Sequence, residues 1–196
     1  MSLRDRWPLD TGLELRDALL ACYAAPTRGY HDERHLTEVL DRLDDLAAAG
    51  EPFDRLPVVL AAWFHDGVYD DAPGPEERSA AWAKDALAAL GVDEAVVAEV
   101  ARLVRLTERH RPAADDANGA ALSDADLAIL AAPAERYDEY VAAVRREYAA
   151  VPDADFHAGR AAVLRDLLAK PHLFQSRHGR ARWEAAARAN VAREVG

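Results

Sequence analysis

Alanine-rich apolar segments, separated by proline and glycine, dominate this chain and restrict it to helical folds. Alanine is the strongest helix former, whereas runs of β-branched residues, which favour strands, are scarce. No stretch alternates apolar and polar residues long enough to indicate a sheet. Proline cannot continue a helix, and it marks breaks at Pro26, Pro133, Pro152 and Pro171. We therefore predict an all-α fold, a bundle of about eight or nine helices without significant sheet.

Apolar periodicity and capping residues define the expected helices. The sixth is expected to open at Ser123 or Asp124, after an exposed loop over residues 111–119, and residues 67–75 form another loop. The other helices are expected over residues 13 to about 25, 32–48, 56–65, 76–90, 93–106, 134–149, 153–169 and 179–195.

The length and charge of the chain narrow its function and location. Its 196 residues suit one domain, and 51% hydrophobic residues are enough to form a core. A net charge of -11 repels phosphate backbones, so we expect no nucleic-acid polymer as a partner. The single cysteine cannot form an intrachain disulfide, the N-terminus lacks the apolar region of a signal peptide, and no apolar run approaches the roughly 20 residues of a membrane span. We therefore expect a cytoplasmic protein with no membrane partner.

Two histidines stand near the start of the second expected helix, in the segment YHDERH. His31 and His35 are four residues apart and share one helical face, a spacing that suits metal ligands. The spacing alone is a weak signal, because paired histidines on a helix are more often surface or capping residues. The pair therefore indicates a metal site only in combination with other clusters of polar residues.

A His-Asp pair ends the third expected helix, whose other residues are apolar (AAWFHDG). Burying an unpaired carboxylate is costly, so Asp66 needs a compensating partner if it lies in the core. A cation bound by His65 and Asp66 is one such partner. The alternative is an exposed helix end that the two side chains cap, and the segment alone leaves both open.

A third pair of polar residues, Asp124 and Asp126, lies in the apolar segment LSDADLAIL. Residues two apart on a helix point about 200° apart, so only one of them is expected to face a shared site. Asp124 suits an N-terminal cap, and Asp126, inside the apolar run, is the better buried ligand. Two imidazoles and two carboxylates suit one divalent ion such as Mn, Fe, Co, Ni, Zn or Mg, and here they would come from His35, His65, Asp66 and Asp126.

The order of these clusters resembles the H…HD…D signature of the HD phosphohydrolase superfamily. Proteins of that superfamily are helical, bind divalent metal and mostly hydrolyse phosphomonoesters or phosphodiesters. The segment YHDERH is similar to the YH-x3-H segment of its cyclic-nucleotide phosphodiesterases, which implies that His35 is a ligand and that His31 protonates the leaving group. The context ADL supports Asp126 over Asp124 as the last ligand.

More narrowly, the chain resembles a group of uncharacterised bacterial proteins described as HD-superfamily metal-dependent phosphohydrolases. The resemblance implies one HD-type helical domain over residues 1–196, with a core at about 28–170 and the N- and C-terminal helices packed on it. It implies a general chemistry but no assigned substrate. The similar segments are RGYHDERHL, AAWFHDGVYD, EERSA, LTERH, SDADLAIL, VRREY and FHAGRAAVLRDLL.

Further polar residues are candidates for catalysis or substrate binding. Glu76 could orient a ligand or the attacking water, and His110 could bind phosphate or help to hold a second metal. The alternatives are a carboxylate favoured by a helix N-terminus and an exposed histidine favoured by a helix C-terminus. Tyr69 could form a wall of the pocket, and Arg145 or Arg160, if turned inward, could bind phosphate through two hydrogen bonds. Surface or structural salt bridges are the alternative for both arginines.

We therefore expect metal-dependent hydrolysis of a small phosphoester, with nucleotides among the candidates and a homodimer left open. The metal would activate the attacking water, His31 would protonate the leaving oxygen, and an arginine would neutralise the remaining charge. One alternative is a non-catalytic, metal-containing helical module for ligand binding or regulation. Another is an interaction protein whose His and Asp residues satisfy one another. Four ligands that meet at one centre beside an open pocket would favour the enzyme.

Overall fold

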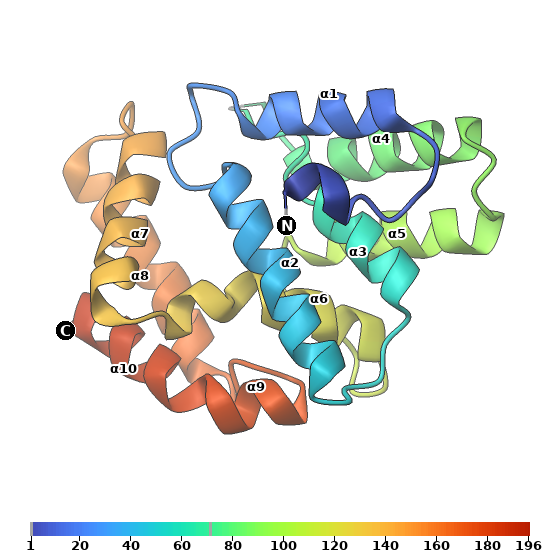
Figure 1. The fold of residues 1–196 in the computed structure, drawn as a ribbon. Coiled ribbons are helices and arrows are strands. Elements are labelled where there is room, and N and C mark those ends of the chain that lie inside the picture. The colour runs from blue at the N-terminus through green and yellow to red at the C-terminus, as the bar shows by residue number, and fades with distance from the viewer. Residues whose placement is uncertain (1, 71) are drawn as a thin grey trace.

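The computed structural model describes residues 2–70 and 72–196. Over these residues the chain folds into ten α-helices and two 3-10 helices and contains no strand, which confirms the predicted all-α fold (Figure 1). In chain order the elements are η1 (Leu3–Arg6), α1 (Leu13–Tyr23), α2 (Glu33–Ala48), α3 (Arg55–Phe64), α4 (Pro75–Ala89), α5 (Glu94–Leu106), α6 (Ala117–Leu127), η2 (Ala128–Ala131), α7 (Ala134–Glu147), α8 (Asp153–Ala169), α9 (Arg177–Arg182) and α10 (Glu184–Val195).

Helix α3 lies at the centre of the molecule, because every residue from Pro57 to Phe64 is buried. Helices α2, α4, α5 and α6 all contact it. One continuous cluster of buried apolar side chains extends from Trp7 to Val191, so the helices near both ends of the chain pack on the same core. Burial of this apolar surface is the main term that holds the bundle together.

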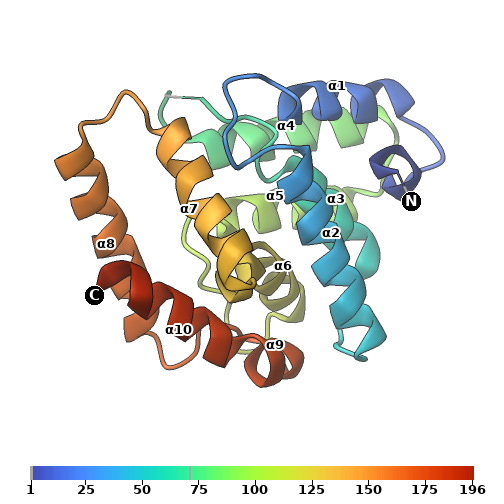
Figure 2. The same cartoon turned by 60° about the vertical axis from the view of Figure 1, so that its left-hand side comes forward.

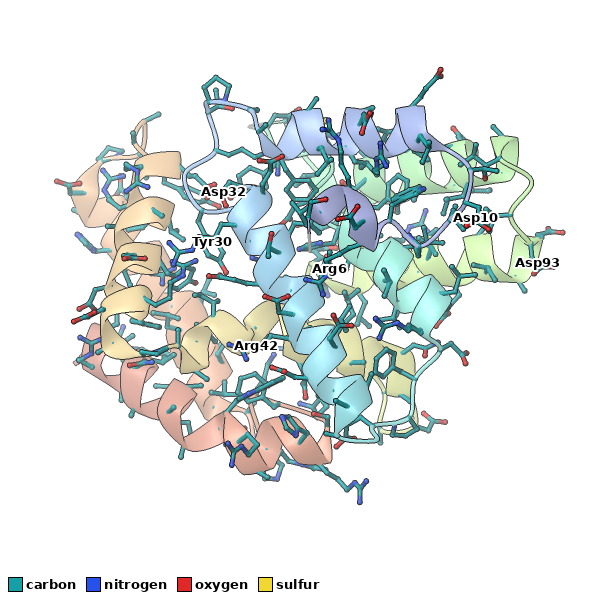
Figure 3. The ribbon with its side chains drawn as sticks, in the orientation of Figure 1. Arg6, Asp10, Tyr30, Asp32, Arg42 and Asp93 are labelled. Atoms are coloured by element: carbon teal, nitrogen blue, oxygen red, sulfur yellow. The ribbon has the colours of Figure 1, made fainter. Side chains whose placement is uncertain are left out.

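Aspartates cap two of the helices that the sequence predicts. The side chain of Asp32 accepts hydrogen bonds from the backbone N–H groups of Arg34 and His35 at the start of α2. Asp93 accepts one from the N–H of Ala95 at the start of α5 (Figure 3). Each carboxylate satisfies N–H groups that have no partner within the helix, which explains why the helices begin at these positions.

Two boundaries differ from the sequence prediction. Helix α6 begins at Ala117, within the expected loop, because the Asp116 side chain accepts a hydrogen bond from the N–H of Gly119 and caps it. The expected last helix is two helices, since the backbone of Trp183 departs from helical geometry with a φ of -114°. The Trp183 ring packs edge-on against Phe174, 5.5 Å between centroids, and this core contact accompanies the break.

Helices α7 and α8 form one side of the molecule, away from α4 and α5 (Figure 1). Helix α10 packs on both α8 and η2 and so links this side to the core (Figure 2). A search of the described residues finds no helix with the length and apolar character that crossing a membrane would require.

Candidate metal centre

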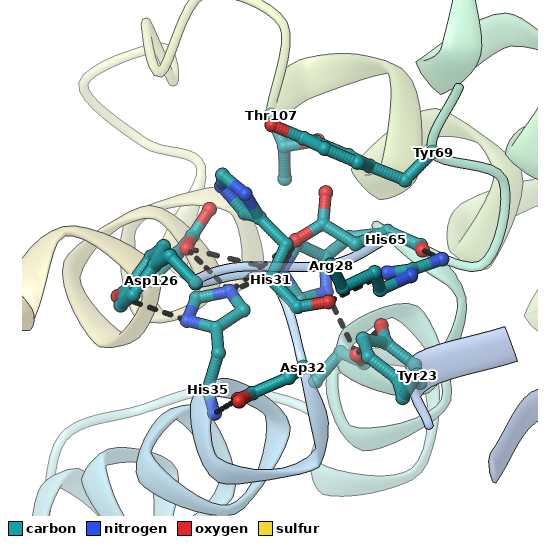
Figure 4. A network of polar contacts seen from close by, with 12 residues as sticks. Tyr23, Arg28, His31, Asp32, His35, His65, Tyr69, Thr107 and Asp126 are labelled. Carbon is teal, nitrogen blue, oxygen red and sulfur yellow. Dashed lines mark hydrogen bonds and ion pairs between the residues drawn. The ribbon is translucent and has the colours of Figure 1, made fainter. Parts of the chain in front are cut away.

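The first element of the site is the first turn of α2, which carries His35. The side chain of His35 is 1% exposed, and its Nδ1 lies 3.0 Å from the hydroxyl of Tyr30. Its backbone N–H donates to the capping carboxylate of Asp32, 3.1 Å away. The Tyr30 contact occupies one ring nitrogen, so Nε2 is the nitrogen that faces the other polar residues of the site (Figure 4).

His65 and Asp66 follow directly on α3. Nδ1 of His65 lies 2.8 Å from the carbonyl oxygen of Ala62. A carbonyl only accepts hydrogen bonds, so Nδ1 carries the proton and donates, and in a neutral ring the lone pair is on Nε2. That Nε2 lies 3.1 Å from Nε2 of His35, although the two histidines are 30 residues apart in the chain.

Helix α6 contributes Asp126. Its Oδ1 lies 3.3 Å from Nε2 of His35 and 3.8 Å from Nε2 of His65. His35, His65 and Asp126 each offer a ligand atom within 4.8 Å of the other two, so this cluster could hold a metal ion.

Asp124 faces the other side of α6 and takes no part in the cluster. It is fully buried, and it accepts hydrogen bonds from the N–H of Gln175 (2.7 Å) and from the N–H and hydroxyl of Ser176 (2.8 and 2.6 Å). It is therefore not the N-terminal cap that the sequence suggested, since α6 begins seven positions earlier, at Ala117. The choice between the two aspartates falls on Asp126, because the sequence spacing sends them to opposite sides of the helix.

Asp66 lies beside the cluster of three. Its Oδ2 is 3.1 Å from Nε2 of His65 and 3.3 Å from Nε2 of His35. The same oxygen is buried and has no partner with hydrogen-bond geometry among the described residues. A buried carboxylate oxygen left in this state is costly, and a cation would compensate it.

The spacing of the donor atoms fits a single small cation. Ligand atoms about 2.1 Å from one ion lie roughly 3.0 Å apart at right angles and roughly 3.4 Å apart at a tetrahedral angle. The separations between the imidazole nitrogens and the carboxylate oxygens run from 3.1 to 3.8 Å. Two imidazoles with a carboxylate suit a divalent ion of borderline softness. Asp66 lies near both histidines but outside the group of three whose donor atoms are all within 4.8 Å of one another.

Mutual charge dominates the titration of these four groups. Burial alone would lower the pKa of His35, but Asp126 and Asp66 outweigh it and raise that pKa to about 10. The same two carboxylates raise the pKa of His65 against the effect of burial. In turn, although burial opposes this, the imidazoles hold the pKa of Asp66 and of Asp126 below the ordinary aspartate value. Protons on the histidines and a divalent ion are thus two ways to balance the same pair of negative charges.

Glu147, at the end of α7, fixes the position of His31 and was missed in the sequence. One of its carboxylate oxygens accepts hydrogen bonds from the backbone N–H groups of Gly29, Tyr30 and His31 at 2.9, 2.8 and 2.9 Å. The other lies 2.7 Å from Nδ1 of His31 and accepts from the Tyr69 hydroxyl at 3.2 Å. Burial would raise the pKa of Glu147, but these hydrogen bonds outweigh it and lower that pKa to about 2.

The glycine in the segment RGYH makes this contact feasible. A Cβ atom at Gly29 would collide with the carbonyl oxygen of Ala143 on α7. Only glycine therefore allows the segment to approach α7 closely enough for three N–H groups to reach one oxygen of Glu147. Gly29 is the one signal in the sequence that could have indicated this contact.

Arg28 joins the His31 segment to the turn after α3 and was also missed. It donates to the carbonyl oxygen of His31 at 2.7 Å and to that of Asp66 at 2.7 Å. Its guanidinium carbon lies 4.9 Å from the ring centre of Tyr23 and 5.4 Å from that of Tyr69. The arginine therefore holds the proposed acid and the proposed ligand segment at a set separation (Figure 4).

His110 lies at the edge of the cluster in a strained conformation. Its φ of 47° is the only positive value for a residue other than glycine among those described. Its Nε2 is 3.5 Å from Oδ2 of Asp126, and its Nδ1 is buried without a hydrogen-bond partner among the described residues. Burial lowers the pKa of His110, although Asp126 opposes this, so the ring is neutral at neutral pH. Backbone strain of this kind persists where surrounding structure imposes it.

A cavity of about 660 Å³ opens beside the cluster and is lined by Asp126, but not by His35, His65 or Asp66. Asp126, His31 and His110 line it together with residues of α8 such as Leu164 and with Lys170, which directly follows α8. This volume lies within the range of small-molecule sites in proteins. The predicted metal ligand Asp126 and the two predicted catalytic histidines thus meet one open space.

Two of the predicted residues contribute to the site by other means than expected. Tyr69 stacks on His31, with ring centres 4.4 Å apart, and supports this ring together with Glu147 instead of lining the cavity. Arg160 does line the cavity, but its guanidinium pairs with Glu194 and lies 4.9 Å from the ring centre of Tyr140. It is therefore already neutralised, which weakens its assignment as a phosphate ligand.

The remaining two predictions are not supported by position. Arg145 donates to Asp153 and to the carbonyl oxygens of Tyr148 and Val151, and it does not line the cavity. These local acceptors capture the guanidinium, as the salt-bridge alternative expected. Glu76 lies in the first turn of α4, and no hydrogen bond or ion pair joins it to the cluster within the described part of the chain. Its neighbour in the helix, Ser79, instead holds the loop after Asp66 through the N–H of Val68, at 2.9 Å.

Comparison of the chain with protein-family models, with curated proteins and with solved structures finds no match in any of the three. Membership of the HD superfamily therefore remains a prediction from the sequence motifs.

Proposed function

We propose that this protein is a metal-dependent phosphohydrolase of the HD superfamily that cleaves a small phosphoester. The observation that carries the proposal is the convergence of His35, His65 and Asp126, of which Asp126 also lines the 660 Å³ cavity. Three separate helices or helix ends bring these donors together, and the cavity gives access to the cluster at Asp126. A purely structural metal site is closed, whereas a catalytic one keeps access open.

A divalent ion held by the two histidines and two aspartates would supply a Lewis acid that polarises the phosphoryl group and lowers the pKa of water. The buried oxygen of Asp66 that lacks a hydrogen-bond partner supports such an ion, as does the lone pair on Nε2 of His65. The interaction-protein alternative requires the His and Asp groups to satisfy one another. Protonated histidines would do so for Asp66, because Nε2 of His65 and of His35 lie 3.1 and 3.3 Å from its Oδ2. Metal analysis therefore decides between the two.

His31 is placed to hand a proton to the leaving oxygen. Its Nδ1 is engaged by Glu147, which leaves Nε2 as the nitrogen without a protein partner among the described residues. The ring lines the cavity and is 5.4 Å from that of His35, centre to centre. A general acid must be held at hydrogen-bond reach of the atom it protonates, and Glu147, Tyr69 and Arg28 together provide that rigidity.

His110 is the second histidine that faces the cavity. Because its ring is neutral, it can donate one hydrogen bond to a phosphoryl oxygen without adding charge. The position of His110 in the wall of the cavity, next to Asp126, is the observation that supports this assignment.

The alternative function is a metal-containing module that binds a ligand without hydrolysis. It shares the donor cluster and the cavity, but it gives no reason for a histidine held by a buried carboxylate at the cavity wall. Hydrolysis accounts for the donor cluster beside the cavity and also for the position of His31.

The proposal is tested by metal analysis of the purified protein, followed by a screen of phosphorylated metabolites with the matching metal restored. We expect about one divalent ion per chain and release of phosphate or of a phosphomonoester from one substrate class. The Asp66→Ala variant is expected to lose both, whereas Asp85→Ala, at an exposed position of α4, is expected to lose neither. Full metal content and activity in Asp66→Ala would refute the assignment.

A further inference from the structure

A second hollow, an apolar groove of about 460 Å³, runs between α7 and α8 and is not used by the proposed metal centre. Most of its lining side chains are aromatic or aliphatic: Tyr140, Val144, Tyr148, Val151, Phe156 and Val163. The two helices lie on the same side of the molecule and are joined by a short loop (Figure 2).

The groove is continuous with the cavity over the metal centre. Four residues line both spaces: His31, Tyr140, Arg160 and Val163. His31 is therefore one of four residues at the boundary between the cavity and the apolar groove. A molecule that is held at the metal centre and extends past His31 enters the groove.

Apolar side chains at the groove remain in contact with solvent. Val163 is 63% exposed and Tyr148 is 46% exposed. They are two of the four large hydrophobic residues that are exposed within the described chain, the others being Leu13 and Leu56. An exposed apolar surface beside a candidate active site is a feature of ligand-binding grooves.

The charges at the groove select against an anionic occupant. Arg160 is neutralised by Glu194, and its guanidinium covers the face of Tyr140. The remaining charged side chain of the lining, apart from His31, is the carboxylate of Asp155. A second phosphate would find no free cation here, whereas an uncharged ring would bury apolar surface against Phe156 and Tyr148.

We infer that the groove binds the leaving group of the substrate, and that this leaving group is an alcohol with an uncharged aromatic ring. This inference rests on the proposed function. Water adds to phosphorus and releases one proton as the ester P–O bond breaks. The ester oxygen keeps the bonding electron pair and takes a proton from His31, which the proton released by water restores. The leaving group therefore departs on the His31 side, where the groove begins.

Two phosphate esters with leaving groups of similar acidity provide the test. Benzyl phosphate and methyl phosphate differ mainly in the ring, so the ratio of their kcat/KM values in the metal-loaded protein reports on the groove. Burial of the phenyl ring is expected to favour benzyl phosphate by roughly 30-fold. The affinities of benzylphosphonate and methylphosphonate, measured by calorimetry, give the same comparison without turnover.

A charge placed in the groove should remove this preference. Val163→Asp is chosen because the side chain is largely exposed, so the fold tolerates it. We expect the benzyl-to-methyl ratio to fall about 10-fold, because the new carboxylate must be desolvated when the ring binds. Leu13→Asp on α1 introduces the same charge at a similarly exposed position and should leave both esters unaffected.

The outcomes separate the two proposals. Equal kcat/KM for both esters, or an unchanged ratio in Val163→Asp, overturns the groove while hydrolysis stands. Preferential binding of benzylphosphonate without hydrolysis of any ester supports the groove and overturns the catalytic proposal. Failure of both phosphonates to bind overturns the groove as well.

Discussion

The two faces of α6 carry aspartates that are two residues apart and differ in every contact. Asp124 accepts hydrogen bonds from two backbone N–H groups and from the hydroxyl of Ser176. Asp126 faces ring nitrogens of His35, His65 and His110. Burial of a carboxylate is therefore not itself a sign of function. Asp126 is the candidate ligand because its neighbours are imidazoles, which can also bind a metal. Asp124 is a structural acid because its neighbours are N–H and O–H groups that only donate hydrogen bonds to it.

Titration shows the same contrast. Burial raises the pKa of Asp124 above the ordinary value despite its hydrogen bonds. For Asp126, burial acts in the same direction, but the nearby histidines reverse the outcome and lower the pKa. The face of α6 toward α2 and α3 is thus organised around charge, and the face toward residues 175–176 around hydrogen bonds.

The largest expected effect is loss of metal from Asp126→Ala. A metal-binding free energy of ~10–16 kcal/mol spread over four ligands corresponds to a loss of roughly 100- to 1,000-fold in affinity when one is removed. Calorimetric titration of metal into the chelator-treated protein measures it. Asp124→Ala is the matched control on the same helix. An equal loss of affinity in both variants would show that the two aspartates do not differ in their contribution to metal binding.

Asp124→Ala is expected to reduce stability instead. It leaves two buried N–H groups and one hydroxyl without an acceptor, which lowers the free energy of unfolding by about 3 kcal/mol. Urea unfolding of the metal-free protein at pH 7 measures this change. A loss below ~1 kcal/mol would show that water or neighbouring groups replace the carboxylate, and that these hydrogen bonds contribute little to the stability of the protein.

A smaller effect is expected when the support of His31 is weakened. Glu147→Gln keeps the shape of the side chain but removes the charge beside Nδ1, and we expect turnover to fall about 10- to 100-fold while metal content is unchanged. Glu135→Gln, at an exposed position of the same helix, is the control. Loss of metal from Glu147→Gln would mean that the His31 segment shapes the donor cluster directly.

The free energy of unfolding of the wild-type protein should decrease at low pH as the Glu147 carboxylate becomes protonated. The pKa of Glu147 is lowered on folding from 4.5 to about 2, so its contribution is complete above pH 4.5 and is lost as the pH falls through 2. The contribution is about 2 kcal/mol after allowance for solvent screening. The difference in unfolding free energy between wild type and Glu147→Gln should therefore shrink as the pH falls from about 5 to about 2.5, which covers most of the interval between the two pKa values. A constant difference would contradict this.

The smallest effect is the dependence of metal affinity on pH. Without metal, the pKa of His35 is about 10, so the ring is protonated at neutral pH and must lose that proton to become a ligand. Affinity should rise about tenfold, or ~1.4 kcal/mol, for each pH unit below that pKa when one proton is released. Calorimetry in buffers of different ionisation enthalpy counts the protons, and binding without proton release would argue against His35 as a ligand.

The helical class and the order of the polar clusters follow from local sequence. Alanine content, proline breaks and capping residues such as Asp32 and Asp93 act over one or two turns, so they could be recognised without the fold. The same is true of the opposed orientation of Asp124 and Asp126, which is a property of helix geometry. The predicted helix boundaries were wrong at two places. The cap by Asp116 starts α6 earlier than predicted, and the break at Trp183 divides the predicted last helix into two.

The pairing of charged groups that are far apart in the sequence depends on the tertiary structure and could not be predicted. Glu147 meets His31 across 116 positions of sequence, and Asp124 meets Ser176 across 52. Arg145 and Arg160 had the chemistry of phosphate ligands, but Asp153 and Glu194 hold them. Hydrogen bonds and ion pairs act only over a few ångströms, and packing of the apolar helix faces sets those distances. The polar residues are therefore brought together by a core to which they contribute little.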